Sequence, residues 1–164
     1  MQRARSGSAD AVSELFLLHW PAVWRAALVV LGSRAEADDA AQDAMLAGIA
    51  ALATFDDARP LGPWLRRIAV NRALDRLRAS RRLVELGELP DSGWAIDEWV
   101  GQQQLAAALR QLAPERRTVV ALRFVLGMPL GEVAECLALP RGTASSRLSR
   151  GLDDLRAILE GPDA

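Results

Sequence analysis

The 164-residue sequence predicts an all-α protein with two small helical domains joined by a flexible acidic linker, the C-terminal one carrying a helix-turn-helix. Apolar residues recur at helical spacings of three and four through most of the chain. One stretch near the middle instead combines turn residues with acidic side chains that repel one another into an extended path. We therefore expect domains at residues 1–82 and 101–164, with the linker at residues 83–100.

The composition argues against an enzyme. Hydrophobic residues make up 51% of the chain, enough to bury a core, and every basic residue is Arg. Metal clusters, Cys–His pairs and Schiff-base lysines need residue types that are absent here or occur once. We expect no catalytic residue, no metal site and no cofactor. We interpret Cys136 as a small core residue and His19 as structural.

The sequence also indicates where the protein works. No stretch approaches the roughly 18 apolar residues of a membrane span, and the N-terminus lacks the apolar core of a secretion signal. A single Cys cannot form an intrachain disulfide, which fits a reducing compartment. We expect a soluble, cytoplasmic protein without membrane insertion.

Charge is segregated along the chain although the formal net charge is only −1. Residues 58–82 hold eight Arg and one acid, a net charge of +7, whereas residues 34–57 and 83–99 each carry −5. A basic segment of this density is typical of nucleic-acid binding, because each neutralised phosphate releases counterions. A solvated basic face is the alternative interpretation.

Three helices are expected in the first domain. The first covers about residues 9–31 by its apolar spacing. The second opens with a capping box at residues 33–36, in which Ser and Glu side chains each accept from a backbone N–H, and it runs to about residue 54. A loop rich in Pro, Gly and Asp follows at residues 55–62. The third helix then covers residues 63–82.

Two of these helices carry a polar face. The early turns of the second helix present acids and an amide, and charge alone favours a face left in water over one that binds a partner. One face of the third helix is lined with polar residues at spacings of four and three, next to an apolar row, and its basic run closes with two arginines. The polar residues are Glu36, Asp38, Asp39, Gln42 and Asp43 on the second helix, and Arg67, Asn71, Asp75, Arg78, Arg81 and Arg82 on the third.

In the second domain, apolar spacing predicts helices at about residues 105–112 and 114–126. A short helix at residues 130–137, a tight turn and a longer helix opening at Pro140 then form the helix-turn-helix. Small residues near the start of the last helix suit base edges, and its arginines suit phosphates. An ordinary helical hairpin with a solvated basic face is the alternative. The outward face shows Thr143, Ser146, Arg147 and Arg150.

Three segments, in this order, resemble motifs of the extracytoplasmic-function branch of bacterial sigma factors. Residues 36–43, EADDAAQD, are similar to the acidic helix with which that family grips the clamp of RNA polymerase. Residues 63–78, preceded by Phe55 in its loop, look like the promoter-melting helix. Residues 142–148, GTASSRL, following EVA at residues 132–134, resemble the promoter-reading helix-turn-helix.

The resemblance implies an alternative sigma factor that binds core RNA polymerase, recognises and melts a two-part promoter, and initiates transcription. It implies promoter DNA as a partner, duplex at the −35 element and single-stranded at the −10 element, and it admits an anti-sigma factor as a further partner. The linker would thread the active-site cleft of the polymerase, although a plain solvated tether explains its sequence as well.

The resemblance also assigns a role to each polar surface. Polymerase docking would use Asp38, Asp39, Gln42 and Asp43. The −10 strand would meet the loop at residues 55–62 and the side chains of Phe55, Arg67, Asn71, Arg78, Arg81 and Arg82. The −35 duplex would meet Arg141, Thr143, Ser146, Arg147 and Arg150.

Two other functions stay open at this point. A stand-alone helix-turn-helix regulator would leave the first domain unexplained, and a sigma mimic that titrates an anti-sigma factor would not need the basic third helix. The sequence also departs from the family pattern in places. Ala138 occupies a turn position where Gly is usual, and the left-handed conformation common there costs another residue roughly 1 kcal/mol. Ser145 replaces a frequent basic residue, and Ala47 and Ile49 replace a basic and an aromatic one.

Overall fold

The structure is a computed structural model that describes residues 2–85 and 103–160 of a chain divided into two compact units, residues 1–91 and 92–164. Both units are helical, and the described residues include no strand, so the predicted all-α fold is confirmed. The linker expected at residues 83–100 lies outside the described residues, apart from three residues that continue the last helix of the first unit.

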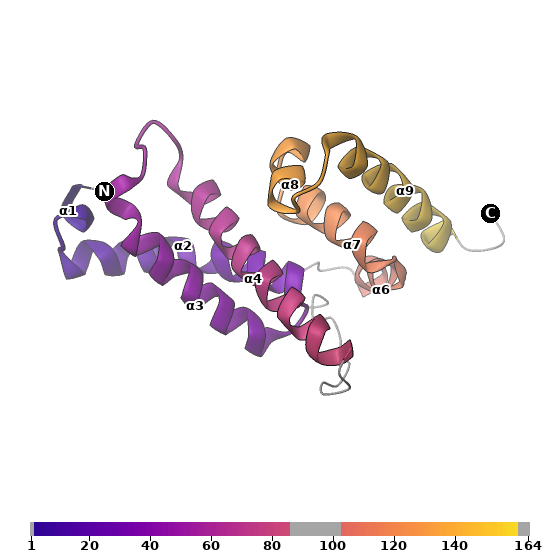
Figure 1. The fold of residues 1–164 in the computed structure, drawn as a ribbon, viewed down its shortest axis with the longest axis horizontal. Helices are drawn as coiled ribbons and strands as arrows, with labels where there is room; N and C mark the ends of the chain where they lie inside the picture. Colours follow the sequence, from indigo (N-terminus) through magenta and orange to yellow (C-terminus); the bar gives the residue numbers. More distant parts are fainter. Residues whose placement is uncertain (1, 86–102, 161–164) are drawn as a thin grey trace. The chain divides into compact units, whose positions relative to one another are not determined.

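The first unit is a bundle of three long helices with two short elements at one end (Figure 1). Its elements are α1 (Gln2–Arg5), α2 (Ala9–Leu31), α3 (Arg34–Ala50), the 3-10 turn η1 (Leu52–Thr54) and α4 (Leu61–Glu85). The three long helices pack pairwise against one another. Small side chains fill much of the space between them, which lets the helices approach closely. The alanines Ala26, Ala27, Ala37, Ala40, Ala41, Ala44, Ala69 and Ala73 are all fully buried.

The junction between α2 and α3 follows from its sequence. Gly32 ends α2 in a left-handed conformation with φ 74°, and its N–H donates to the carbonyl of Leu28. The Ser33 hydroxyl then accepts from the N–H of Glu36 at 3.4 Å, which is one half of the predicted capping box. Glycine is suited to this end because it has no Cβ to clash in the left-handed region.

α4 begins two residues earlier and ends three residues later than predicted, at Leu61 and Glu85. Pro63 therefore lies inside the first turn and does not open it. The N–H groups of a first turn have no partner within the helix, so proline is tolerated at any of these positions. Pro63 therefore indicated the first turn of α4 correctly, but not the residue at which the helix begins.

α2 spans Ala9–Leu31 as predicted, but the expectation that no stretch resembles a membrane span was wrong for this helix. Its 23 residues reach a mean hydropathy of 1.4 over an 18-residue window, enough by length and composition to cross a membrane. Of that window, 39% is buried within the unit, and the helix packs against both α3 and α4. The core helix of a soluble protein can meet the same test, and packing accounts for the buried part of this helix, whereas Leu17 and Leu18 near its start are exposed.

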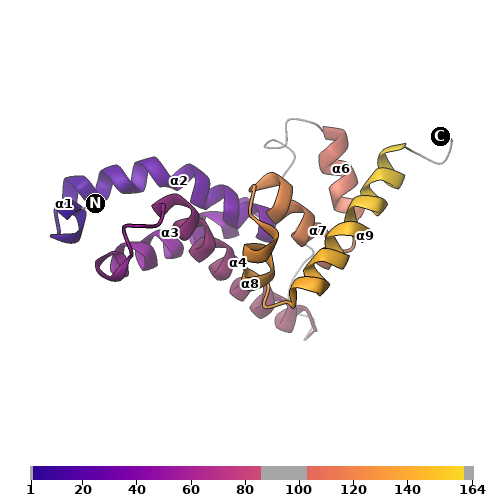
Figure 2. The same ribbon diagram turned by 90° about the horizontal axis from the view of Figure 1, so that it is seen from above.

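The second unit contains the helix-turn-helix. Its elements are α6 (Gln103–Gln111), α7 (Pro114–Val120), the π-helical turn η2 (Ala121–Val125), α8 (Leu130–Cys136) and α9 (Arg141–Glu160). α9 packs against α6, α7 and α8 (Figure 2). The one helix expected over residues 114–126 is thus α7 followed by a wider turn. In that turn the N–H of Leu126 donates to the carbonyl of Ala121, five residues back.

Close packing of α7 on α9 depends on Gly151. A Cβ at this position would lie 2.8 Å from Cγ2 of Val120, too close for an ordinary contact. An ion pair between Arg116 on α7 and Asp154 on α9 crosses the same interface. The glycine thus allows the two helix backbones to approach where the ion pair joins them.

Cys136 and His19 take structural places, as predicted. Cys136 is buried in α8. His19 is half-buried in α2, where its ring lies close to Gly62, and burial lowers its pKa. Neither residue takes part in the surfaces described below.

Candidate functional site

The polar residues of α3 lie on its outer surface. Asp38, Asp39, Gln42 and Asp43 are all exposed, while the alanines between them are buried against the other helices. The helical period of 3.6 separates the two sets, because the alanines recur at spacings of three and four. The result is an acidic surface on a helix whose inner side is packed.

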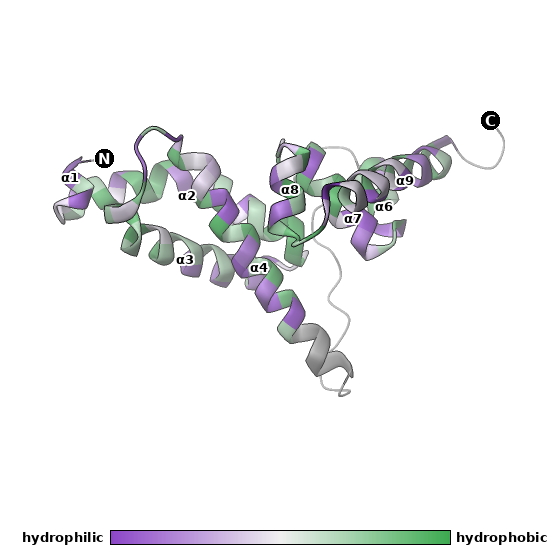
Figure 3. Cartoon of the chain, turned by 45° about the horizontal axis from the view of Figure 1, so that its top comes forward, coloured by the Kyte–Doolittle hydropathy of each residue, from purple (hydrophilic) through white to green (hydrophobic). Residues whose placement is uncertain are grey.

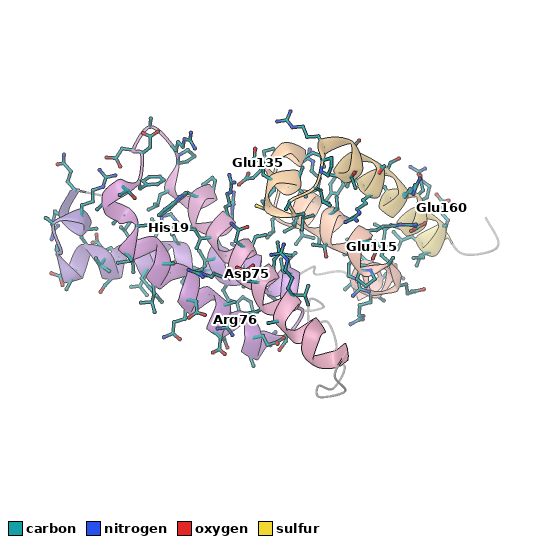
Figure 4. The ribbon with its side chains drawn as sticks, in the orientation of Figure 1. His19, Asp75, Arg76, Glu115, Glu135 and Glu160 are labelled. Atoms are coloured by element: carbon teal, nitrogen blue, oxygen red, sulfur yellow. The ribbon has the colours of Figure 1, made fainter. Side chains whose placement is uncertain are left out.

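Part of this acidic surface has partners within the first unit. Arg76, labelled in Figure 4, lies on α4. It donates from Nη2 to Oδ2 of Asp43 at 2.6 Å and from Nη1 to Oδ2 of Asp39 at 3.5 Å. The hydrogen bond with Asp43 is the main reason that the pKa of Arg76 is raised above its ordinary value. Trp24 donates from its indole N–H to Asp38. Charge pattern alone favoured a face left wholly in water, and these contacts modify that expectation.

α4 presents a polar face along its middle turns, where hydrophilic and hydrophobic residues alternate in Figure 3. Arg67, Asn71 and Arg78 are exposed, and their spacings of four and seven place them on one side of the helix. Arg78 pairs with Asp75 at 2.8 Å within the same helix. The backbone of residues 81–82 belongs to α4, whereas the side chains of Arg81 and Arg82 lie outside the described part of the chain.

Phe55 is not a surface residue in this structure. Its side chain is 8% exposed, and its ring lies 4.7 Å from that of Trp64, tilted by 44°. Residues 56–60, which follow it, are all exposed. The loop therefore rests on the buried ring of Phe55 and the half-buried ring of Trp64, and residues 56–60 are its exposed part.

The loop is also held from the N-terminus. Arg5 at the end of α1 donates to the carbonyls of Leu52 and Phe55 and to the carboxylate of Asp57. Sequence spacing gave no sign of this contact, because it joins residues about fifty positions apart. The only signal in the sequence was a basic residue in a short polar segment ahead of the first apolar helix.

The outer face of α9 carries the polar residues expected of a recognition helix. Arg141, Ser146 and Arg150 are exposed, while Thr143 and Arg147 are half-buried. In the turn before α9, Ala138 has φ 53° and so adopts the left-handed conformation anticipated at that position. The order of α8, a turn and α9 is that of a helix-turn-helix, a motif whose second helix contacts DNA through its N-terminal residues.

An apolar pocket of 220 Å³ lies in the second unit between α6, η2 and α9. Phe124 at its edge is 58% exposed, with the Arg123 guanidinium 5.6 Å from its ring centroid. The sequence contained a signal for this surface, namely a second apolar row on the predicted helix of residues 114–126. The lining residues are Leu105, Leu109, Val120, Phe124, Val125, Leu152 and Leu155.

Comparisons with known proteins cover both units. Residues 15–83 match the family model for sigma-70 region 2, and residues 108–157 match that for sigma-70 region 4. The chain is 26% identical to the ECF RNA polymerase sigma factor SigW of Bacillus subtilis, covering 97% of this chain and 94% of SigW. It is 30% identical to the RNA polymerase sigma factor CarQ of Myxococcus xanthus, covering 97% of this chain and 95% of CarQ. The solved structure of CnrH with the cytosolic domain of CnrY aligns with a TM-score of 0.64 at 30% identity, covering 99% of this chain and 96% of CnrH.

Proposed function

The chain belongs to the extracytoplasmic-function branch of the sigma-70 family of RNA polymerase sigma factors, and from this premise we propose how its two domains divide the work of an alternative sigma factor. The function is binding of core RNA polymerase and promoter DNA to initiate transcription. The observation that supports it is the match to region 2 followed along the chain by the match to region 4. A stand-alone regulator is set aside, because the first domain that it left unexplained matches region 2. Proteins of this family are initiation factors rather than enzymes, and we place this one in the cytoplasm beside the polymerase.

The acidic surface of α3 docks on core polymerase in this proposal. Asp38, Asp39, Gln42 and Asp43 are exposed on a helix whose opposite side is fixed by packing, so a partner meets them in a set arrangement. Carboxylates held in this way attract a basic surface and raise the rate of encounter. Arg76 already neutralises part of the charge, so the polymerase surface must compete with it.

The polar face of α4 and the neighbouring loop hold the displaced −10 strand. Arg67, Asn71 and Arg78 support this role by their shared exposure, since arginines can follow a backbone while an amide reads an unstacked base. Arg81 and Arg82 extend the same basic run.

Phe55 requires a different role within the same proposal. Because its ring is buried against Trp64, we assign it to support of the loop, and we assign strand contact to the exposed residues 56–60.

The N-terminal half of α9 reads the −35 duplex in the major groove. Thr143 and Ser146 suit contacts with base edges, since a hydroxyl can both donate and accept. The three arginines Arg141, Arg147 and Arg150 suit phosphates on either side of the groove. Ser146 donates to the carbonyl of Thr143 at 3.0 Å in the free protein, and a base contact would replace this local bond.

An anti-sigma factor is the regulatory partner in this proposal. CnrH, a similar structure at 30% identity, was solved with the cytosolic domain of CnrY. The pocket beside Phe124 gives the second domain of this chain an apolar surface on which an amphipathic segment of such a partner can pack.

The experiment that tests the function is run-off transcription with core RNA polymerase on fragments of the source genome. We expect discrete transcripts that require both the protein and core polymerase. Tight, sequence-specific gel shifts by the protein alone at physiological salt would instead favour a stand-alone regulator. Absence of transcripts together with capture of an anti-sigma factor would favour a decoy.

A further inference from the structure

Arg5 reaches across the first unit to the segment that leads into α4. Its Nε donates to the carbonyl of Leu52 at 2.9 Å, one Nη to the carbonyl of Phe55, and the other to Oδ2 of Asp57 at 3.0 Å. A guanidinium presents five N–H donors in a fixed planar fork, so one side chain can satisfy three acceptors at once. Arg5 thus fixes two backbone carbonyls and one side chain of the same segment.

α1 is held against the first unit by apolar packing of Ala4. Ala4, Ala11 and Leu52 form a small buried cluster, against which Leu15 and Leu61 pack among other partly buried side chains. Leu52 precedes the loop and Leu61 follows it, so the cluster joins α1 and the start of α2 to both ends of the loop. The guanidinium of Arg5 is therefore held in place by the helix that carries it.

Within the loop, the hydrogen bonds are local. Asp56 accepts from the N–H of Ala58 through Oδ1 and from the N–H of Arg59 through its carbonyl, both at 3.0 Å. Such bonds shape a turn but do not fix its direction relative to a neighbouring helix. The contacts of Arg5 come from about fifty residues away and do fix that direction.

We infer that Arg5 is a positioning residue for the −10 loop. It holds the backbone of residues 52–57 so that the exposed residues 56–60 keep one arrangement beside the polar face of α4. A loop ordered before binding does not lose conformational entropy when the strand arrives, so base discrimination is strengthened. This inference rests on the proposed role of the loop in binding the −10 strand.

An effect of Arg5 on DNA binding could also come from direct attraction of DNA by its charge. A variant of Arg3 distinguishes this attraction from positioning of the loop. Arg3 lies on the same short helix and is exposed. Arg3→Ala removes the same charge from nearly the same place but keeps the three contacts of Arg5. It is therefore the matched control for Arg5→Ala.

The first measurement is hydrogen exchange of the full-length protein. Arg5→Ala should reduce the protection of the backbone N–H groups of residues 55–59, while Arg3→Ala should not. Asp57→Ala removes one of the three acceptors and should give a smaller change in the same direction, which keeps the test informative if Arg5→Ala folds poorly. Unchanged loop protection in Arg5→Ala would overturn the inference.

The second measurement is transcription by holoenzyme on a promoter and on variants with single base changes in the −10 element. Arg5→Ala should lose discrimination among these variants on the order of tenfold, comparable with removal of one charge-assisted hydrogen bond. Arg5→Lys should rescue little, because an ammonium group cannot span three acceptors in one plane. Binding to an isolated −35 duplex should be unchanged.

The possible outcomes separate failure of the positioning role of Arg5 from failure of the proposed function. Equal losses in Arg5→Ala and Arg3→Ala, with no loss of discrimination, would show attraction by charge and overturn the positioning role. Unchanged discrimination among the −10 variants, despite reduced protection of the loop, would also overturn the positioning role. If the unaltered protein gives no promoter-specific transcript, the proposed function fails, and the positioning role fails with it.

Discussion

The guanidinium of Arg76 donates to the carboxylate of Asp43 at 2.6 Å and thereby ties α4 to α3. These two helices carry the surfaces that we assign to DNA and to polymerase, respectively. Asp39 shares the same arginine at 3.5 Å. If the polymerase engages these acids as proposed, we expect Arg76 to be released and the positive charge available on α4 to increase.

Replacement of Arg76 tests this competition. Arg76→Ala should strengthen binding to core polymerase, because Asp39 and Asp43 lose their internal partner, and should lower the free energy of unfolding by about 0.2–1 kcal/mol, as for an exposed pair. A fluorescence titration with core polymerase measures the affinity. Arg72→Ala is the matched control, since Arg72 is an exposed arginine one turn earlier on α4. Equal effects of the two changes would contradict the competition.

Salt and pH extend this prediction. The raised pKa of Arg76 means that the stabilising charge is present below the ordinary pKa of arginine and is lost only as pH rises through the higher folded value. The difference in free energy of unfolding between Arg76→Ala and the unaltered protein should therefore be constant across neutral pH. It should shrink as salt screens the exposed pair.

Strand opening should depend on Asn71. Asn71→Ala should lower open-complex formation on a duplex promoter more than on a template with a pre-melted −10 region, since the amide is proposed to hold an unstacked base. Permanganate footprinting of both templates measures the effect. Equal losses on the two templates would make Asn71 a general contributor to binding and remove its role in opening.

Arg147 distinguishes backbone contact from base contact on α9. Arg147→Ala should weaken binding to the −35 element about uniformly across altered sequences and reduce the salt slope by about one, because we assign it to a phosphate. Filter binding by holoenzyme at several salt concentrations measures both quantities. A loss of ~1–3 kcal/mol confined to one base position would instead reveal base contact. An undiminished −35 footprint would exclude Arg147 from the interface.

Helix packing in the second domain should be sensitive to a single methyl group. Gly151→Ala should destabilise this domain by about 1–3 kcal/mol, because the new Cβ would meet Val120 and force the helices apart. Gly142 is the matched control on the same helix, since a Cβ there meets nothing within 4 Å. Gly142→Ala should stabilise by up to about 1 kcal/mol through helix propensity. Thermal unfolding of both variants measures these changes. Stabilisation by both substitutions would contradict the close approach of α7 and α9 at Gly151.

Local sequence signals predicted most of the fold but few of its long-range contacts. Gly32, Ser33 and the turn around Ala138 act within a few residues, so the end of α2, the cap of α3 and the left-handed turn could be anticipated. α1 was missed because four residues are too few to show a period.

The site was predicted unevenly for the same reason. Periodicity identifies the exposed face of one helix, and Asp39, Asn71 and Ser146 are all exposed as a result. It does not say which helices adjoin, so the contact of Arg76 with Asp43, 33 residues away, stayed hidden. Phe55 lies in a loop, where no period separates an inward from an outward side chain.

The π-helical turn η2 bears on how this domain tolerates changes in length. A turn closed between Leu126 and Ala121 contains one residue more than an α-helical turn, as if a single residue had been inserted. Loss of one residue from a regular helix rotates everything beyond it by about 100°. Loss of one residue from η2 would instead restore α-helical geometry and keep the helix-turn-helix in register. We therefore expect the segment around Phe124 to tolerate the loss of one residue without loss of the helix-turn-helix fold.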